Sequence, residues 1–215
     1  MTPMPTVLVT AFEPFDGQST NASWSAVEGL AHGWSGPARV VVLRLPVSFE
    51  GAPAALRAAV VEHRPALVLC VGEAGGRRAV GVERVAVNLV DAPIADNDGN
   101  LPVDRAVVEG GPTAYFSTLP VKACVARILA AGVPAEVSGT AGTYVCNAVF
   151  YALMDLLAAA PDVRGGFVHV PRTPAQVPTD GPSLATQAAT RALDLVVRTS
   201  LERPPEESLR GGATH

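Results

Sequence analysis

The stretch SGTAGTYVCNAVFYALMDLL, residues Ser138–Leu157, decides how the central part of the fold is built. Its first residues include Gly139 and Gly142, which favour a turn, and from Val145 onward apolar residues recur at the three-and-four spacing of a helix face. The pattern predicts a turn that leads directly into a helix packed on the core. Cys146 then falls within about one turn of the start of that helix.

Cys146 fits two roles at this position. The unpaired backbone N–H groups and the positive end of the helix dipole favour a thiolate over a thiol and can bind a developing oxyanion, which suits a nucleophile. Free cysteine is also among the most buried residue types and packs as a small hydrophobe. Position alone favours the packing role, so the rest of the chain has to decide between the two.

The bulk properties narrow the class of protein. The 215 residues are enough for one sizeable domain, which we expect to span residues 1–203, followed by a polar, disordered tail at 204–215. A formal net charge of -4, with basic residues scattered singly, gives no reason to expect nucleic-acid binding. No apolar run approaches the roughly 18 residues of a membrane span, and the first residues do not resemble a signal peptide. We therefore expect a cytoplasmic protein that binds neither nucleic acid nor a membrane.

The three cysteines support the same compartment. Cys70, Cys124 and Cys146 are an odd number with no close pair, which suits a reducing environment and excludes a CxxC metal or redox site. Cys70 lies in the apolar run ALVLCVG and Cys124 in the helical stretch VKACVARILAAG, so both are expected in the core.

Apolar runs rich in β-branched residues alternate with helical patterns along the chain. We expect strands at residues 6–12, 39–45, 66–71, 82–90, 115–119, 135–138 and 166–170, and helices at about 22–31, 49–63, 121–131, 145–157 and 183–201. Continuous apolar strands that alternate with helices are typical of a parallel or mixed sheet covered on both faces, and so of an α/β fold.

The segment from Gly72 to Thr113 differs in character, because only its strand-like part at 82–90 has a regular pattern. Long ordered loops in compact domains are more often functional than idle, so we expect part of this segment to cover or line a site. The glycines of GEAGG are not accompanied by GxxxxGK or by a complete GxGxxG, so a nucleotide site is not expected there.

His169 stands out among the four histidines because it lies near the C-terminal end of an apolar strand. In open α/β sheets, ligands bind in the crevice outside those ends, where Cys146 at a helix start can meet His169. A thiol that attacks an amide carbonyl needs a base, and it needs a third group to fix the imidazole tautomer. Glu73, Glu83 and Asp91 all lie near expected strand ends, and sequence physics alone does not choose among them.

Taken together, four ordered segments resemble the pyroglutamyl-peptidase I family, also called pyrrolidone-carboxylate peptidase. The resemblance extends over about residues 6–200, and its four segments are AFEPFDGQSTNAS at 11–23, GEAGGRRAVGVERVAVNLVDAPIADNDGNLP at 72–102, SGTAGTYVCNAVFYALM at 138–154 and GGFVHVPRTPAQ at 165–176. Such an ordered set is far more specific than any one of its motifs.

The resemblance implies a three-layer α/β/α sandwich around a twisted mixed, mostly parallel sheet. It also implies a cysteine exopeptidase that removes N-terminal pyroglutamate from peptides through a thioester acyl-enzyme, without a metal or other cofactor. Carried over by position, Cys146 is the nucleophile, His169 the general base and Glu83 the orienting acid. The family further suggests a homo-oligomer, often a tetramer.

The pocket for the pyrrolidone ring is also implied by the resemblance. Phe12 and Phe15 would pack on the five-membered ring, and Asn21 would read its lactam groups. Tyr144 and the backbone around Glu73 would complete the pocket.

Two departures from the family pattern leave an alternative open. The family commonly has arginine where Pro93 stands and glutamine where Glu73 stands, and Arg77, Arg78 or Arg84 would have to replace the missing arginine. The alternative is a pyroglutamyl-binding paralogue with weak or no turnover. A nucleoside-phosphorylase-like enzyme on a similar fold is disfavoured, because the sequence offers no basic phosphate site.

Overall fold

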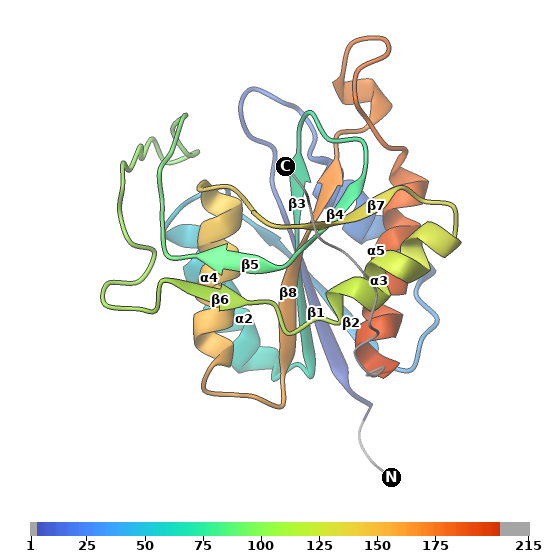
Figure 1. The fold of residues 1–215 in the computed structure, drawn as a ribbon, viewed down its shortest axis with the longest axis horizontal. Helices are drawn as coiled ribbons and strands as arrows, with labels where there is room; N and C mark the ends of the chain where they lie inside the picture. The colour runs from blue at the N-terminus through green and yellow to red at the C-terminus, as the bar shows by residue number, and fades with distance from the viewer. Residues whose placement is uncertain (1–3, 203–215) are drawn as a thin grey trace.

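The computed structural model describes residues 4–202; the disordered tail expected at 204–215 lies outside this range. Its main sheet has the strand order β2-β1-β3-β8-β4-β7 (Figure 1). The strands of this sheet are β1 (Thr6–Phe12), β2 (Arg39–Leu45), β3 (Leu67–Ala74), β4 (Val80–Glu83), β7 (Ala135–Ser138) and β8 (Arg164–Pro171). Neighbouring strands run parallel except β4 and β8, which run antiparallel.

Helices cover both faces of this sheet, and Figure 1 shows α2 and α4 on one side and α3 and α5 on the other. The helices are α1 (Ala22–Gly33), α2 (Gly51–His63), α3 (Val121–Ala130), α4 (Val145–Leu157) and α5 (Thr186–Glu202), with a short 3₁₀ turn η1 (Pro174–Gln176). None of the helices within residues 4–202 has the length and apolar character needed to cross a membrane. The three-layer α/β/α sandwich with a mixed, mostly parallel sheet confirms the predicted fold class.

The core forms two layers because successive side chains of a strand point to opposite faces. On β1, Val7 and Val9 pack with α1, α3 and α5, whereas Leu8 packs with α2 and α4. Cys124 is buried in the first layer and Cys70 in the second, as predicted for both.

Helix α4 is largely buried in the second core layer. Val149, Phe150, Tyr151 and Leu153 are fully buried there, and the Phe150 ring lies 5.8 Å from the ring of Phe167 on β8. This packing fixes the start of the helix, and therefore Cys146, against the sheet.

The prediction of a single strand at 82–90 is wrong, because this segment forms two strands that belong to different sheets. Strand β4 ends at Glu83, and β5 (Val85–Val87) pairs antiparallel with β6 (Ala114–Phe116) in a separate two-stranded sheet. Arg84 lies at the junction: its N–H donates to Ser138 O at 2.9 Å, and its carbonyl accepts from Ser117 N at 2.9 Å. The apolar pattern runs on without interruption, but the pairing partner changes at this residue.

The long loop at 91–113 is tied down through Asp96, which is buried. Its carboxylate accepts hydrogen bonds from the backbone N–H groups of Phe49, Asp98 and Asn100 and from the Asn100 side chain, at 2.7 to 3.2 Å. Burial alone would raise the pKa of Asp96, but the Phe49 N–H and the other donors outweigh burial and lower the pKa below its ordinary value.

Asp96→Asn is expected to lower the free energy of unfolding by about 1–3 kcal/mol at pH 7, because it places an NH₂ group among donors that then lack an acceptor. The lowered pKa means that the stabilisation is complete above about pH 4, the ordinary pKa of an unfolded aspartate, and is lost as pH falls through the lower folded pKa. Chemical denaturation at pH 7 and at a series of acid pH values measures both effects.

The matched control is Asp98→Asn, because Asp98 is exposed on the same loop. This variant should unfold like the wild type at every pH. A difference between Asp96→Asn and wild type that stays constant down to about pH 2 would contradict the assigned direction of the pKa shift.

Candidate active site

Strand register brings His169, Gly72 and Glu83 together. His169 on β8 is paired with Gly72 on β3 and with Gly81 on β4. Paired residues on neighbouring strands direct their side chains to the same face of the sheet, and residues two apart on one strand share a face. His169 and Glu83 therefore both point to the face that α2 and α4 cover.

Cys146 approaches this point from the helix layer that covers the same face of the sheet. It is the second residue of α4, and its Sγ lies over Gly72, where a Cβ would be only 2.8 Å from the sulfur. Because Gly72 has no side chain, the thiol occupies the place that a strand residue paired with His169 would otherwise fill. The structure thus brings Cys146 and His169 to adjacent positions near the carboxyl ends of β3 and β8.

The imidazole of His169 is held by a buried carboxylate. Its Nδ1 lies 2.8 Å from Glu83 Oε1, with His169 only 4% exposed and Glu83 fully buried. A carboxylate oxygen accepts hydrogen bonds, so this contact calls for a proton on Nδ1 of His169. Of the three acids that sequence physics left open, Glu83 is the one that contacts His169.

Arg77 supports the same carboxylate. Its guanidinium donates to Glu83 Oε1 at 3.1 Å, to Ser138 Oγ at 3.4 Å and to Thr140 O at 3.2 Å. Ser138 and Thr140 belong to the turn that leads to α4, so one side chain bridges Glu83 and the approach to Cys146. Glu83 Oε2 has no hydrogen-bond partner among the described residues.

The surroundings of the Cys146 sulfur favour the thiol form over the thiolate. Burial raises the pKa of Cys146 to about 12, the negative charge of Glu83 acts in the same direction, and Arg77 opposes it only in part. Loss of hydration and the nearby negative charge therefore outweigh the positive charge of Arg77. Cys146 is protonated at neutral pH, so an attack by its sulfur has to be accompanied by proton transfer to a base.

A small pocket opens beside the thiol. It is lined by all five residues predicted for the pyrrolidone pocket, by Cys146, and by two residues that the sequence did not indicate; together these are Phe12, Phe15, Asn21, Val47, Glu73, Tyr144, Val145 and Cys146. Val47 and Val145 are ordinary apolar residues next to a strand end and at a helix start, and nothing in their local pattern marks them as pocket residues.

Aromatic contacts shape the pocket wall. The ring centroids of Phe15 and Tyr144 lie 6.3 Å apart, and Phe49 packs edge-on against Tyr144 at 5.3 Å. The Tyr144 hydroxyl donates to Ala95 O at 2.9 Å, which joins the pocket wall to the loop at 91–113. This contact places part of the Gly72–Thr113 segment beside a site, as predicted.

Asn21 lines the pocket, but its side chain is already used within the protein. Its Oδ1 accepts from the N–H and hydroxyl of Ser23, which makes Asn21 the N-cap of α1, and its Nδ2 donates to Glu13 O at 2.9 Å. One Nδ2 hydrogen remains for a ligand, so the lactam-reading capacity of this side chain is smaller than the resemblance implied.

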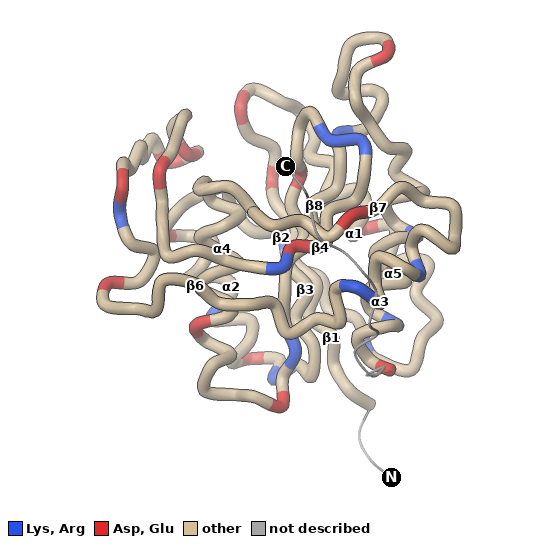
Figure 2. The backbone as a smooth tube through the Cα atoms, in the orientation of Figure 1, with Lys and Arg blue, Asp and Glu red and all other residues tan. Residues whose placement is uncertain are grey.

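The two departures from the family pattern have different outcomes in space. Pro93 is exposed on the loop, and of the three arginines that the sequence offered in compensation, Arg77 reaches the site. Arg78 instead donates to Asp180 O, and Arg84 lines a different pocket. Figure 2 shows the Lys and Arg residues of the described chain dispersed over the fold.

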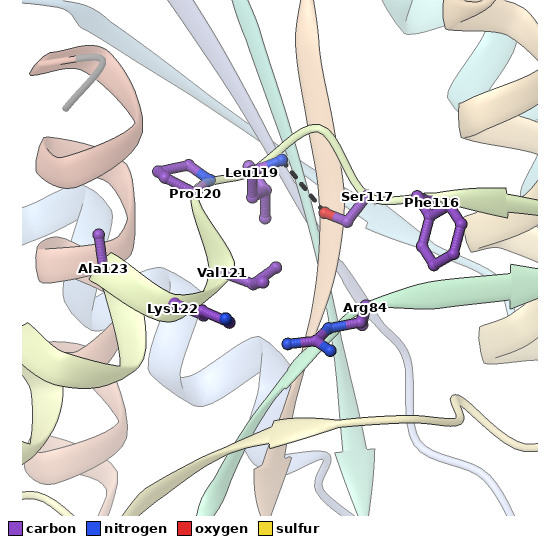
Figure 3. A pocket seen from close by; sticks show the side chains of 8 residues that line it. All are labelled: Arg84, Phe116, Ser117, Leu119, Pro120, Val121, Lys122 and Ala123. Carbon is purple, nitrogen blue, oxygen red and sulfur yellow. Dashed lines mark hydrogen bonds between the residues drawn. The ribbon is translucent and has the colours of Figure 1, made fainter. Parts of the chain in front are cut away.

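This other pocket lies at the start of α3 and contains none of the predicted site residues. Figure 3 shows Arg84, between β4 and β5, and Lys122 of α3 approaching it, with Leu119 N donating to Ser117 Oγ at its edge. It is lined by Arg84, Phe116, Ser117, Leu119, Pro120, Val121, Lys122 and Ala123. The pocket beside Cys146, in contrast, contains the predicted pocket residues together with the cysteine and an apolar wall.

An α/β/α sandwich with a helix-start cysteine and a histidine–glutamate pair at its strand ends has the arrangement of a cysteine peptidase. The family model described as pyroglutamyl peptidase matches residues 5–203. The chain belongs to the pyroglutamyl peptidase family.

Relatives in two bacteria and two solved structures agree with this family. Pyrrolidone-carboxylate peptidases of Clavibacter michiganensis and Pectobacterium carotovorum are each 50% identical, over 98% and 99% of this chain and 99% and 100% of the relatives. The crystal structure of pyroglutamyl peptidase I from Bacillus amyloliquefaciens is 43% identical with a TM-score of 0.91, covering 98% of this chain and 100% of that one. Pyrrolidone carboxyl peptidase from Thermococcus litoralis is 37% identical with a TM-score of 0.88, covering 93% and 94%.

Gly72→Ala is expected to displace the thiol and to destabilise the fold by about 1–3 kcal/mol, because the added methyl group overpacks the site. Its Cβ would lie 2.8 Å from Cys146 Sγ and 2.9 Å from Phe167 Cζ, closer than atoms can pack. Gly139→Ala is the matched control, because a Cβ there meets nothing within 4 Å. Chemical denaturation of both variants checks this, and equal stabilities would show that the site has room at Gly72.

Proposed function

We propose that this protein removes N-terminal pyroglutamate from peptides, with Cys146 as nucleophile, His169 as general base and Glu83 as orienting acid. The observation that carries the proposal is the 2.8 Å contact between His169 Nδ1 and Glu83 Oε1, on strands beside the glycine over which the Cys146 sulfur lies. Support comes also from relatives of about the same length that are named pyrrolidone-carboxylate peptidases.

The first chemical step joins attack and proton transfer. Because the pKa of the Cys146 thiol is about 12, we assign its proton to His169 Nε2 as Sγ bonds to the carbonyl carbon that follows the lactam ring. Backbone N–H groups in the first turn of α4 have no partner within the helix and can stabilise the oxyanion that forms. Glu83 stays ionised and stabilises the imidazolium.

The second step breaks the amide bond. His169 gives its proton to the departing amine, the C–N bond breaks, and pyroglutamate remains on Cys146 as a thioester. Water then attacks the thioester carbonyl while His169 accepts its proton. The C–S bond breaks, free pyroglutamate leaves, and the proton returns to the Cys146 sulfur, so no group outside the protein and water is needed.

The pocket supports the choice of substrate. Pyroglutamate has no free α-amino group, so its recognition calls for an apolar wall and a few polar groups instead of an anionic anchor. Phe12, Phe15 and Tyr144 supply that wall beside Cys146. A ring that fills a small pocket leaves no space for a preceding residue, which favours cleavage at the N-terminus only.

We also propose that the protein acts in the cytoplasm as a homo-oligomer. Cys70, Cys124 and Cys146 are all free thiols, which suits a reducing compartment. Phe116 and Val103 are exposed apolar side chains that a second copy could cover. Light scattering after size exclusion should give a multiple of the 22.1 kDa chain mass, and a monomer at micromolar concentration would contradict the assembly.

A fluorogenic pyroglutamyl amide is expected to be hydrolysed by the wild type and not measurably by Cys146→Ala. His169→Ala and Glu83→Gln should lower kcat by at least about 10³-fold and 10²-fold, because they remove the base and the group that fixes its tautomer. Cys124→Ala is the control and should retain activity, because Cys124 is buried in the other layer of the core.

The same assay tests the alternative of a binding paralogue. Calorimetric binding of pyroglutamate by a wild type that shows no thiol-dependent turnover would favour the paralogue and overturn the proposed catalysis. Turnover that persists in Cys146→Ala would exclude Cys146 as the nucleophile.

A further inference from the structure

A second buried carboxylate, that of Glu73, lies at the pocket and takes no part in the proposed chemistry. Its side chain is only 1% exposed. Its Oε2 accepts from the Ala22 N–H and the Gln176 side chain, both at 2.7 Å, and its Oε1 accepts from Arg172 Nε at 2.9 Å. Two segments far from Glu73 in the sequence, one at Ala22 and one at Arg172 and Gln176, therefore meet on its carboxylate.

Arg172 supplies the positive charge among these donors. It follows β8 directly, and its guanidinium lies across Gly75, where a Cβ would be 3.2 Å from Nε and 3.3 Å from Cζ. The absence of a side chain at Gly75 gives Arg172 the room to reach Glu73. A buried carboxylate without such a cation is costly, because the hydrogen bonds of Ala22 and Gln176 come from uncharged groups.

The negative charge of Glu73 affects the pKa of the Cys146 thiol. Burial is the main cause of the raised pKa of Cys146, and among the further causes the negative charge of Glu73 acts in the same direction. An electrostatic influence that reaches the thiol also reaches a ring bound in the pocket that Glu73 and Cys146 both line. The net charge of the Glu73–Arg172 pair therefore affects which rings bind.

The pyroglutamyl ring and the N-terminal prolyl ring are both five-membered and differ mainly in charge. The pyroglutamyl ring is an uncharged lactam, whereas an N-terminal prolyl ring of nearly the same shape carries a secondary ammonium. Shape alone separates such rings poorly, and an anionic pocket would attract the ammonium. Neutralisation of Glu73 removes that attraction.

We propose that Arg172 is a specificity-determining residue, which pairs with buried Glu73 and so keeps the pocket selective for the uncharged lactam over the cationic prolyl ring. This inference rests on the proposed function and names how its substrate class is selected.

The test compares pyroglutamyl and prolyl fluorogenic amides on Arg172→Met. This variant should lower kcat/KM for the pyroglutamyl amide about tenfold, mainly through KM, and raise the prolyl-to-pyroglutamyl ratio by at least about tenfold. Glu73→Gln/Arg172→Met removes both charges and should return the ratio to that of the wild type. Arg172→Gln, which keeps a hydrogen-bond donor without the charge, should raise the ratio as Arg172→Met does.

Arg198→Met is the matched control. Arg198 pairs with Asp194 at 2.7 Å within α5, and α5 contributes no residue to the pocket. This variant should leave the ratio unchanged. Circular dichroism and thermal melts establish which variants fold, and Arg172→Gln carries the test if Arg172→Met does not.

Folded Arg172→Met and Arg172→Gln proteins with the wild-type ratio would overturn the inference. The inference would also be overturned if kcat/KM fell equally for both amides in the Arg172 variants and the double variant did not restore it. The ratio is also measured by calorimetry, as binding of the two amides on a Cys146→Ala background. A wild type without turnover would then overturn the proposed function alone, while the binding ratio still decides the role of Arg172.

Discussion

The contact between His169 Nδ1 and Glu83 Oε1 joins two strands that run in opposite directions, and the site depends on that pairing. In the main sheet, β4 and β7 run parallel to each other and opposite to β2, β1, β3 and β8, so the strand direction reverses once, between β8 and β4. This reversal places Gly81 opposite His169 and brings Glu83 to the same face two residues later. It also makes Ser138, the β7 partner of Glu83, the start of the turn that leads to Cys146. One local reversal thus sets the acid, the base and the approach to the nucleophile.

Much of the fold could be predicted from local patterns, because an apolar strand or an amphipathic helix is recognisable from consecutive residues. The break at Arg84 was not predictable in this way, since the pattern of 82–90 is uninterrupted and only the partner strands differ. Cys146 and His169 stood out by their positions at a helix start and a strand end. Glu83 was singled out by resemblance, and the structure adds the contact with His169 that residue spacing could not show.

The roles of the two arginines, Arg77 and Arg172, could not be predicted from local patterns either. Arg77 was only one of three arginines considered, and Arg172 lay inside a quoted motif without a role. Arg172 and Glu73 are 99 positions apart, so no periodicity or spacing links them. In both cases an arginine pairs with a buried carboxylate, and for Glu73 that arginine comes from a distant segment. Such long-range compensation is a property of the folded chain, and sequence patterns record only its parts.

The glycine beneath the thiol has a consequence for how this family can diverge. A side chain at position 72 and a sulfur at position 146 compete for one volume, so each residue restricts what the other can become. A descendant that lost the thiol would be released from this restriction, and larger residues could accumulate at position 72. Such a replacement would make a return to thiol chemistry sterically difficult, and it would mark a lineage that has abandoned catalysis at this site.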